Sequence, residues 1–173
     1  MTTCNICNKL FYSKNSLVKC CGYDCALIYA RQQQQKVIEK SQRKVKKEGL
    51  EKLKTKSDYL KEVQTVFNAY IRKRDEGNGC ISCETNNGQM HAGHYRSTSV
   101  APHLRFNEDN VHKQCAKCNT YLSANLINYR IRLIKKIGSE NVELLENNNS
   151  TLRVTIEELK ELKEIYKNKI KLC

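Results

Sequence analysis

The residues best suited to chemistry lie between Cys80 and Asn119, where two C-x-x-C pairs enclose all four histidines of the chain. Two cysteines three residues apart on a tight turn can bind one side of a metal ion, and two such pairs complete a tetrahedral zinc site. Cys80, Cys83, Cys115 and Cys118 are therefore predicted to bind one structural zinc. Disulfides are the alternative, which we disfavour because nothing in the sequence indicates an oxidising compartment.

A second cysteine cluster lies near the N-terminus, where Cys4 and Cys7 precede Cys20, Cys21 and Cys25. A C-x2-C pair combined with the C-x3-C pair Cys21/Cys25 predicts a second zinc site in a small finger. A loosely ordered tail with free thiols is the alternative. The segment also carries basic and aromatic residues, which suit DNA contact and equally suit a finger that packs only on itself. They are Lys9, Phe11, Tyr12, Lys14 and Lys19.

Composition limits both the size of the core and the kind of partner. The chain has 173 residues, of which 39% are hydrophobic, so we expect one or two small domains without a large core. Its 31 Lys and Arg residues against 18 Asp and Glu residues indicate a polyanionic partner, most often nucleic acid. No apolar run approaches the roughly 20 residues that span a bilayer, and no signal peptide precedes the first cysteines, so a cytoplasmic protein is expected.

Helices are expected before the first C-x-x-C pair. The polar, basic stretch from Ala26 to about Lys56 predicts an exposed helix interrupted at Gly49, which either neutralises DNA phosphates or serves only as a solvated linker. The next helix, capped by Asp58, carries an apolar face that should pack on the zinc-bound module. The residues of this face are Tyr59, Leu60, Val63, Val66, Phe67, Tyr70 and Ile71.

Helices are also expected after Asn119. The first should end at Gly138, direct Arg130, Arg132, Lys135 and Lys136 along DNA, and bury one apolar face. The residues of that face are Leu122, Leu126, Tyr129, Leu133 and Ile137. A short helix near 140–146, an Asn-rich turn at 147–149 and a last helix capped by Thr155 and Glu158 should follow. The apolar stripe of the last helix is predicted to be core or a dimer face, and it comprises Leu159, Leu162, Ile165, Tyr166 and Ile170.

The order of these motifs resembles the HNH, or ββα-metal, nucleases: a C-x-x-C pair, a strand ending in His94, a loop, Asn110 five residues before Cys115, and Asn119 directly after Cys118. The Cys-Asn ending resembles the phage endonuclease VII resolvases. Further segments resemble the NinG/Rap recombination endonucleases of lambdoid phages over nearly the whole chain. These segments are His91-Ala-Gly-His94-Tyr-Arg, Ala101-Pro102, Leu104-Arg-Phe-Asn-Glu108, Asn110-Val-His-Lys-Gln-Cys115 and Asn125-Leu-Ile-Asn-Tyr-Arg130.

The resemblance implies a mostly helical α+β fold, with a zinc-bound ββα-metal core of the HNH or treble-clef-like type and flanking helices. We expect an N-terminal Cys4 zinc finger over residues 1–30, a basic helical linker over 31–57, and the nuclease domain over 58–173. The resemblance favours Cys21 over Cys20 as a zinc ligand. It also implies cleavage of branched recombination DNA, such as Holliday junctions or displacement loops, in the bacterial host cytoplasm. Junction resolution needs two coordinated cuts, so a homodimer is expected.

The resemblance also implies roles for individual residues. His94 is the expected general base, because a neutral histidine titrates near the operating pH. Asn119 is an expected ligand of a catalytic Mg²⁺ or Mn²⁺, and Asn110 completes the site, although Asn in such a place more often ties a loop together. The family carries an acidic metal ligand beside its catalytic histidine, where this chain has Gly93. His91 is our substitute ligand, and a histidine there favours Mn²⁺ over Mg²⁺.

The remaining histidines are expected to be less important, with His112 directed toward phosphate and His103 exposed in a loop. Two other functions stay open. A non-catalytic zinc DNA-binding or recombination-mediator protein would explain both cysteine clusters, and Gly93 is its best support. The second of these functions is that of an HNH endonuclease that cuts linear duplex DNA.

Overall fold

The computed structural model describes residues 1–13, 15, 17–148 and 150–173, so Lys14 and the last residue of the Asn-rich turn, Asn149, lie outside the described residues. The chain divides into two compact units, Met1–Lys54 and Thr55–Cys173. Helices predominate and the strands are short, which confirms a mostly helical α+β fold. Within the described residues, no helix is both long and apolar enough to cross a membrane.

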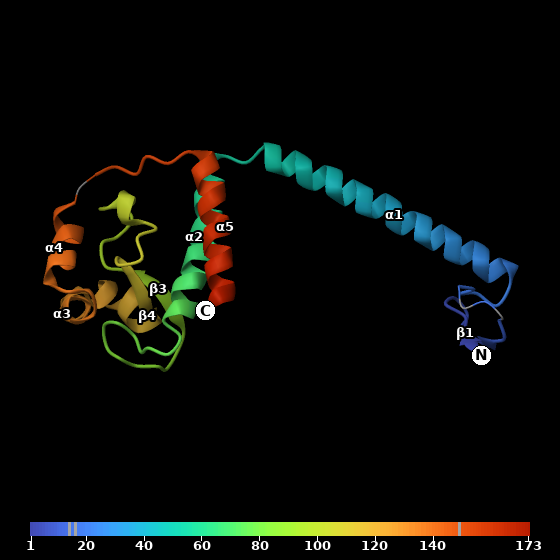
Figure 1. Cartoon of the computed structure of the whole chain (residues 1–173), viewed down its shortest axis with the longest axis horizontal. Coiled ribbons are helices and arrows are strands. Elements are labelled where there is room, and N and C mark those ends of the chain that lie inside the picture. The colour runs from blue at the N-terminus through green and yellow to red at the C-terminus, as the bar shows by residue number, and fades with distance from the viewer. Residues whose placement is uncertain (14, 16, 149) are drawn as a thin grey trace. The chain divides into compact units, whose positions relative to one another are not determined.

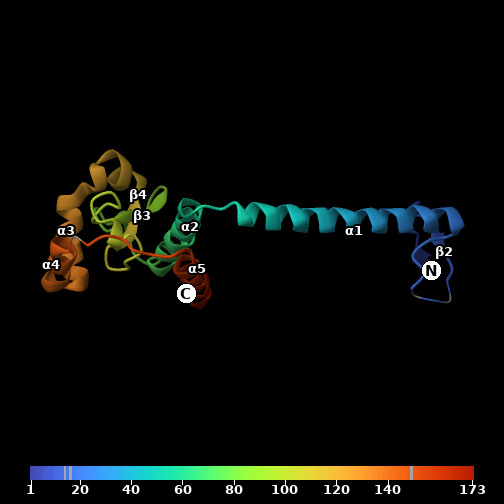
Figure 2. The same cartoon turned by 90° about the horizontal axis from the view of Figure 1, so that it is seen from above.

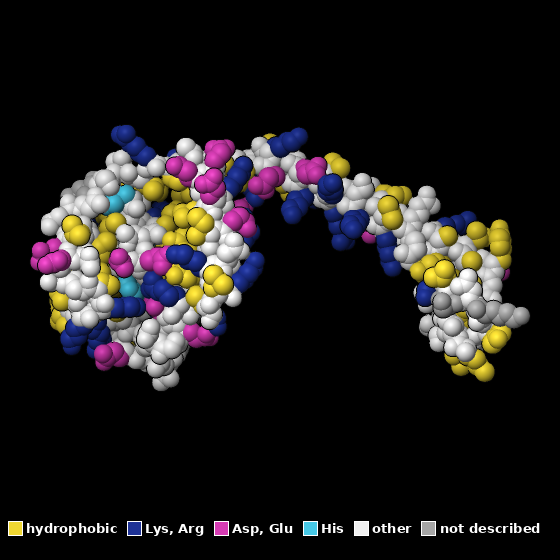
Figure 3. All heavy atoms as spheres, viewed as in Figure 1, with side chains coloured by type: hydrophobic (Ala, Val, Ile, Leu, Met, Phe, Trp, Pro, Cys, Tyr) yellow, Lys and Arg dark blue, Asp and Glu magenta, His cyan; other side chains and the backbone are white. Residues whose placement is uncertain are grey.

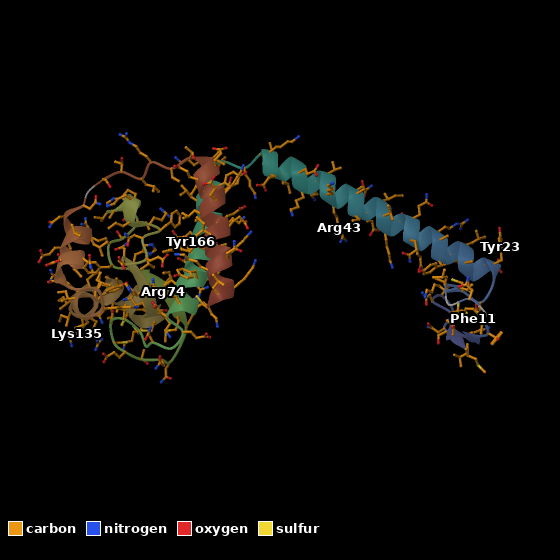
Figure 4. The ribbon with its side chains drawn as sticks, in the orientation of Figure 1. Phe11, Tyr23, Arg43, Arg74, Lys135 and Tyr166 are labelled. Carbon is orange, nitrogen blue, oxygen red and sulfur yellow. The ribbon has the colours of Figure 1, made fainter. Side chains whose placement is uncertain are left out.

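The first unit joins a two-stranded ribbon to one long helix (Figure 1). Strands β1 (Thr2–Thr3) and β2 (Leu10–Phe11) pair antiparallel, and α1 runs over Tyr23–Lys52. No residue of α1 is buried, and Lys and Arg side chains, Arg43 among them, are spread along it (Figures 3 and 4). The expected interruption at Gly49 is wrong. One glycine costs a helix only about 1 kcal/mol relative to alanine, and the rest of α1 offsets that cost.

In the second unit an antiparallel hairpin lies between two pairs of helices (Figures 1 and 2). Strand β3 (Met90–His94) pairs with β4 (Val111–Cys115), which places Gly93 opposite His112. The helices on one side are α2 (Lys56–Arg74) and α5 (Ile156–Leu172), and those on the other are α3 (Leu126–Ile137) and α4 (Ser139–Asn147). Short helical turns fill the connections: η1 (Pro102–Leu104), η2 (Lys117–Tyr121) and η3 (Ser123–Asn125).

Local capping explains where the helices of this unit begin and end. The Thr55 side chain accepts from the Asp58 N–H while the Asp58 carboxylate accepts from the Thr55 N–H, so Thr55 rather than Asp58 is the N-cap of α2. Thr155 and Glu158 form the same capping box at α5, as predicted. Gly138 ends α3 with a φ of 87°, which glycine adopts without steric cost.

Apolar clusters hold both helix pairs against the hairpin. Phe67 of α2, Val111 of β4 and Tyr166 of α5 are buried together, and the Phe67 and Tyr166 rings meet edge to face at 4.8 Å. Tyr129 and Leu133 of α3 are buried against α4. Within the predicted apolar stripe of α5, Leu159 and Tyr166 are therefore core, whereas Ile165 is 50% exposed.

The connection that leads into α3 differs from the expected helix. Leu122 and Leu126, predicted to face inward, are 48% and 47% exposed. The reason is that α3 begins only at Leu126, directly after the turn η3, in which Ser123, Ala124 and Asn125 all have positive φ. The register of the helical face therefore does not extend back to Leu122.

Asp75, at the end of α2, connects three elements of this unit. It accepts hydrogen bonds from Arg74 and from the Lys113 main-chain N–H of β4, and it pairs with Lys136 of α3 at 3.2 Å. Burial by itself would raise the pKa of this carboxyl, but these partners outweigh burial and lower the pKa to about 2. Arg74 lies between the end of α2 and the hairpin (Figure 4), where it also donates to the Val111 carbonyl.

Candidate functional site

The first candidate site is the cysteine cluster beside the hairpin. The sulfur atoms of Cys80, Cys83, Cys115 and Cys118 all lie within 4.8 Å of one another. The second pair forms a tight turn in which the Cys118 N–H donates to Cys115 Sγ at 3.5 Å. Burial raises the pKa of the Cys83 thiol to about 12; hydrogen bonds with the neighbouring cysteines add to this effect, and a main-chain hydrogen bond at Thr85 opposes it. The four sulfur atoms have the residue type and spacing of a structural zinc site.

The N-terminal unit holds the second cluster. Cys4, Cys7, Cys21 and Cys25 also place their sulfur atoms within 4.8 Å of one another, which confirms the predicted grouping and its capacity to bind zinc. Cys20 is buried beside this cluster but does not belong to it.

His94 is the last residue of β3, and its ring lines a cavity of about 790 Å³. Its Nε2 lies 3.0 Å from the carbonyl oxygen of Arg105. A carbonyl oxygen can only accept, so Nε2 of the neutral ring carries the hydrogen and Nδ1 keeps its lone pair. Burial lowers the pKa of His94; the bond to the carbonyl opposes that effect, and the positive charge of Arg105 adds to it. His94 is therefore neutral at physiological pH and can accept a proton at Nδ1.

Asn119 lines the same cavity and contacts His91, the other predicted metal ligand. Asn119 Nδ2 lies 3.1 Å from His91 Nδ1. Asn119 therefore lies between the cavity that His94 lines and the His91 ring, which is not among the residues that line this cavity. The two side chains offer one oxygen and one nitrogen as possible ligands for a divalent ion.

Gly93 explains why the chain carries no acidic residue beside His94. A Cβ atom at this position would lie 2.1 Å from Gln114 Oε1. Gln114 is fully buried, and its Nε2 donates to Ser82 Oγ at 2.7 Å and to the Ala124 carbonyl. The space that an acidic side chain would need is therefore occupied by Gln114, a residue that our sequence reasoning did not single out.

Asn110 positions the loop between the strands and does not line the cavity. Its Oδ1 accepts from the Arg96 N–H at 2.8 Å, and its Nδ2 donates to the carbonyls of Arg96 and Leu104 at 3.0 and 3.2 Å. The side chain is fully buried. The assignment of Asn110 to the catalytic group is therefore replaced by the structural role that Asn commonly takes in loops.

Neither remaining histidine lies where it was expected. His112 is buried 3.4 Å from the Tyr129 hydroxyl, and burial lowers its pKa to about 3, so it does not face phosphate. The ring nitrogens of His103 are buried instead of exposed, because η1 folds its segment onto the core through Ala101 and Leu104.

Three arginines line the cavity, and none of the described residues that line it is acidic. They are Arg96, Arg105 and Arg130. Sequence reasoning missed Arg96 and Arg105, since they line the same cavity as His94 only in the folded chain. Of the basic residues expected along DNA from α3, three are already ion-paired: Arg130 with Glu146, Arg132 with Glu84, and Lys136 with Asp75. Lys135, also on α3, is labelled in Figure 4.

The fold and these sites define a small helix-rich α+β protein with two cysteine clusters suited to zinc and one arginine-lined cavity that contains a neutral histidine. A family model described as the Bacteriophage Lambda NinG protein matches residues 1–173, and the chain belongs to the NinG family.

Proteins of lambda-like phages show the same relationship. The chain is 50% identical to "Protein ninG" of Escherichia phage lambda over 120 residues, which cover 69% of this chain and 59% of that protein. It is 48% identical to "Protein ninG" of Escherichia phage 933W and 47% identical to that of Salmonella phage P22, again over 69% of this chain and 60% and 59% of those proteins. The matches thus span less than two thirds of these relatives. No solved structure matches the chain significantly.

Proposed function

We propose that this chain is a metal-dependent DNA endonuclease of the HNH, or ββα-metal, type. The observation that carries the proposal is the setting of His94. Its neutral ring lies at a strand end, is held at Nε2 by the Arg105 carbonyl, and lines a cavity together with three arginines. A hairpin next to a Cys4 cluster, followed by a helix, agrees with the ββα arrangement that the sequence resemblance implies.

His94 acts as the general base in this proposal. Its Nδ1 takes a proton from a water molecule while the water oxygen forms a bond to phosphorus. One P–O ester bond then breaks, and the leaving oxygen takes a proton from solvent. The histidine returns its proton to solvent, so the reaction consumes one water molecule for each phosphodiester cut.

His91 Nδ1 and Asn119 Oδ1 would hold one face of a divalent metal ion, with water and phosphate oxygens as the other ligands. When bound, Mg²⁺ or Mn²⁺ stabilises the charge that develops on the phosphate and the leaving oxygen. The imidazole ligand and the lack of a carboxylate on the described cavity wall favour Mn²⁺.

Branched recombination intermediates, Holliday junctions and displacement loops, are the proposed substrates, and a homodimer is the proposed active form. Both proposals rest on the resemblance to recombination endonucleases. The basic helix α1 would supply sequence-independent contacts to DNA phosphates.

A non-catalytic DNA-binding or recombination-mediator protein is the second candidate, and one observation favours it. Gln114 packs against Gly93 and leaves no space there for the acidic metal ligand that the HNH resemblance implies at this position. A chain that kept the zinc-bound scaffold and lost its chemistry would show the same feature.

The test compares wild type, His94→Ala and His103→Ala on a labelled four-way junction and a matched linear duplex, with Mg²⁺, with Mn²⁺ or with EDTA. His103 is the matched control because it lies outside the cavity. We expect divalent-ion-dependent cutting of the junction by wild type and His103→Ala, and binding without cutting by His94→Ala. Zinc content is measured in every arm, so that chelation of structural zinc is not mistaken for loss of the catalytic ion. Binding without cutting under any metal would replace the endonuclease by the second candidate, and preferential cutting of linear duplex would overturn the branched substrate.

A further inference from the structure

Arg105 lines the cavity as an incompletely paired cation. A guanidinium group offers five N–H donors. In the described part of the chain, Arg105 uses one of them, from Nη1 to Gln64 Oε1 at 3.3 Å, and its Nε is buried without a partner. A partly buried charge without a carboxylate partner is costly, and an anion would offset that cost. The setting of this side chain therefore indicates an anionic ligand.

The other two arginines of the cavity do not share this property. Arg130 forms a two-pronged ion pair with Glu146, with N–O distances of 2.7 and 3.1 Å. Arg96 donates to the main-chain carbonyls of Leu145 and Glu146. Both hold α4 to the rest of the unit, so Arg105 is the cavity arginine with the fewest hydrogen-bond partners among the described residues.

Neighbouring residues hold Arg105 in place through hydrogen bonds. Asn110 fixes the loop that carries it by bonding the Leu104 carbonyl. Gln64 of α2 accepts from Arg105 and is itself held through a 2.8 Å hydrogen bond from its Nε2 to Asn68 Oδ1. The main-chain carbonyl of Arg105 holds the His94 ring at 3.0 Å. One residue thus orients the proposed base with its backbone and presents a charged side chain to the same cavity.

We propose that the Arg105 guanidinium is the phosphate-binding group of this cavity and, on the proposed function, contacts a non-bridging oxygen of the phosphodiester next to His94. The planar fork of a guanidinium matches two phosphate oxygens, whereas a lysine ammonium binds only as a point charge. Charge that develops on the phosphate in the transition state strengthens this contact, so Arg105 acts on the rate more than on affinity.

The test measures single-turnover cleavage and DNA affinity for wild type, Arg105→Ala, Arg105→Lys and Arg153→Ala. Arg153 is the matched control because it is an exposed arginine outside the cavity. We expect Arg105→Ala to slow cleavage by about 10²–10³-fold, the usual effect of losing one donor to a developing oxyanion, and to weaken binding only a few-fold. Arg105→Lys should recover part of the rate, and Arg153→Ala should change little. If the cleavage rate of Arg105→Ala lies within about threefold of the rate of Arg153→Ala, the proposal is overturned, because loss of one such donor should cost far more.

A second measurement separates this proposal from the nuclease proposal. The full zinc-loaded chain is titrated with inorganic phosphate, with chloride at equal ionic strength as the reference, while the NMR signals of the His94 ring are followed. Phosphate should shift these signals in wild type and Arg153→Ala but not in Arg105→Ala. Because the substitution leaves the Arg105 carbonyl in place, the His94 ring should remain bonded in all variants. If wild type cuts no DNA yet shows the Arg105-dependent shift, the phosphate site stands and the nuclease proposal fails; an identical shift in Arg105→Ala would refute the phosphate site whatever the cleavage result.

Discussion

Replacing Gly93 with alanine should destabilise the second unit strongly, although the substitution adds only one methyl group. The new Cβ would lie 2.1 Å from Gln114 Oε1, 2.9 Å from Gln114 Cβ and 3.0 Å from Gln114 Cδ. The φ of Gly93 lies outside the left-handed region, so the effect is steric and not a matter of backbone conformation. Gln114 cannot move away without breaking its hydrogen bonds to Ser82 and Ala124.

The expected loss follows from two contributions. Overpacking a close-packed core costs about 1–3 kcal/mol. A buried polar group left without its partner costs about 1–3 kcal/mol more. We therefore expect a loss of roughly 2–6 kcal/mol, a large share of the about 5–15 kcal/mol that stabilises an ordinary domain.

Urea unfolding of the zinc-loaded chain at fixed free zinc measures this loss. Near-UV circular dichroism of the buried tyrosines is the suitable signal, because the long helix α1 of the other unit contributes strongly to the far-UV signal. Gly77→Ala is the matched control, since a Cβ there meets nothing within 4 Å, and it should change stability by less than about 0.5 kcal/mol.

A double-mutant cycle then identifies the cause. Replacing Gln114 with alanine in the Gly93→Ala background should remove the contacts with Oε1 and Cδ and leave only the 2.9 Å contact with Cβ, so we expect a favourable coupling of about 1 kcal/mol or more between the two sites. The reasoning is refuted if Gly93→Ala is as stable as Gly77→Ala, or if the effects of Gly93→Ala and Gln114→Ala simply add.

Three further predictions concern the metal clusters and the histidines. Cys83→Ser should lower bound zinc, measured by elemental analysis, from two ions per chain to one and should destabilise the second unit, whereas Cys173→Ser, outside both clusters, should leave two. The single-turnover rate should stay constant as pH falls from 8 to 7 and decline only below 6.5, the pKa of an ordinary histidine. The reason is that burial lowers the pKa of His94 and the neutral ring is the active form. A decline that begins above pH 7 would contradict this assignment. The contribution of His112 to the free energy of unfolding should be fully present above pH 6.5 and lost as pH falls toward about 3, because the unfolded chain binds the proton that the buried ring excludes. His112→Gln should remove this part of the pH dependence of thermal unfolding. An unchanged profile would argue against the buried neutral ring.

The sequence by itself determined the features that depend on residues close together in the chain. Spacings of three and four residues within each cysteine pair predicted both clusters, because ligands on one turn reach the same ion. Helical periodicity predicted the buried face of α2, and the Thr155–Glu158 spacing predicted the start of α5. Local rules failed where two residues could each cap the same helix: Thr55, and not the predicted Asp58, is the N-cap of α2.

The tertiary structure decided the features that depend on residues far apart in the chain. Gly93 and Gln114 compete for one volume only because β3 pairs with β4 in a register that puts them on the same face. Arg105 reaches His94 only because Asn110 folds the intervening loop, and no periodicity in the sequence reports that fold. Steric exclusion and the pairing of charges depend on distances in space, and those distances are set by packing.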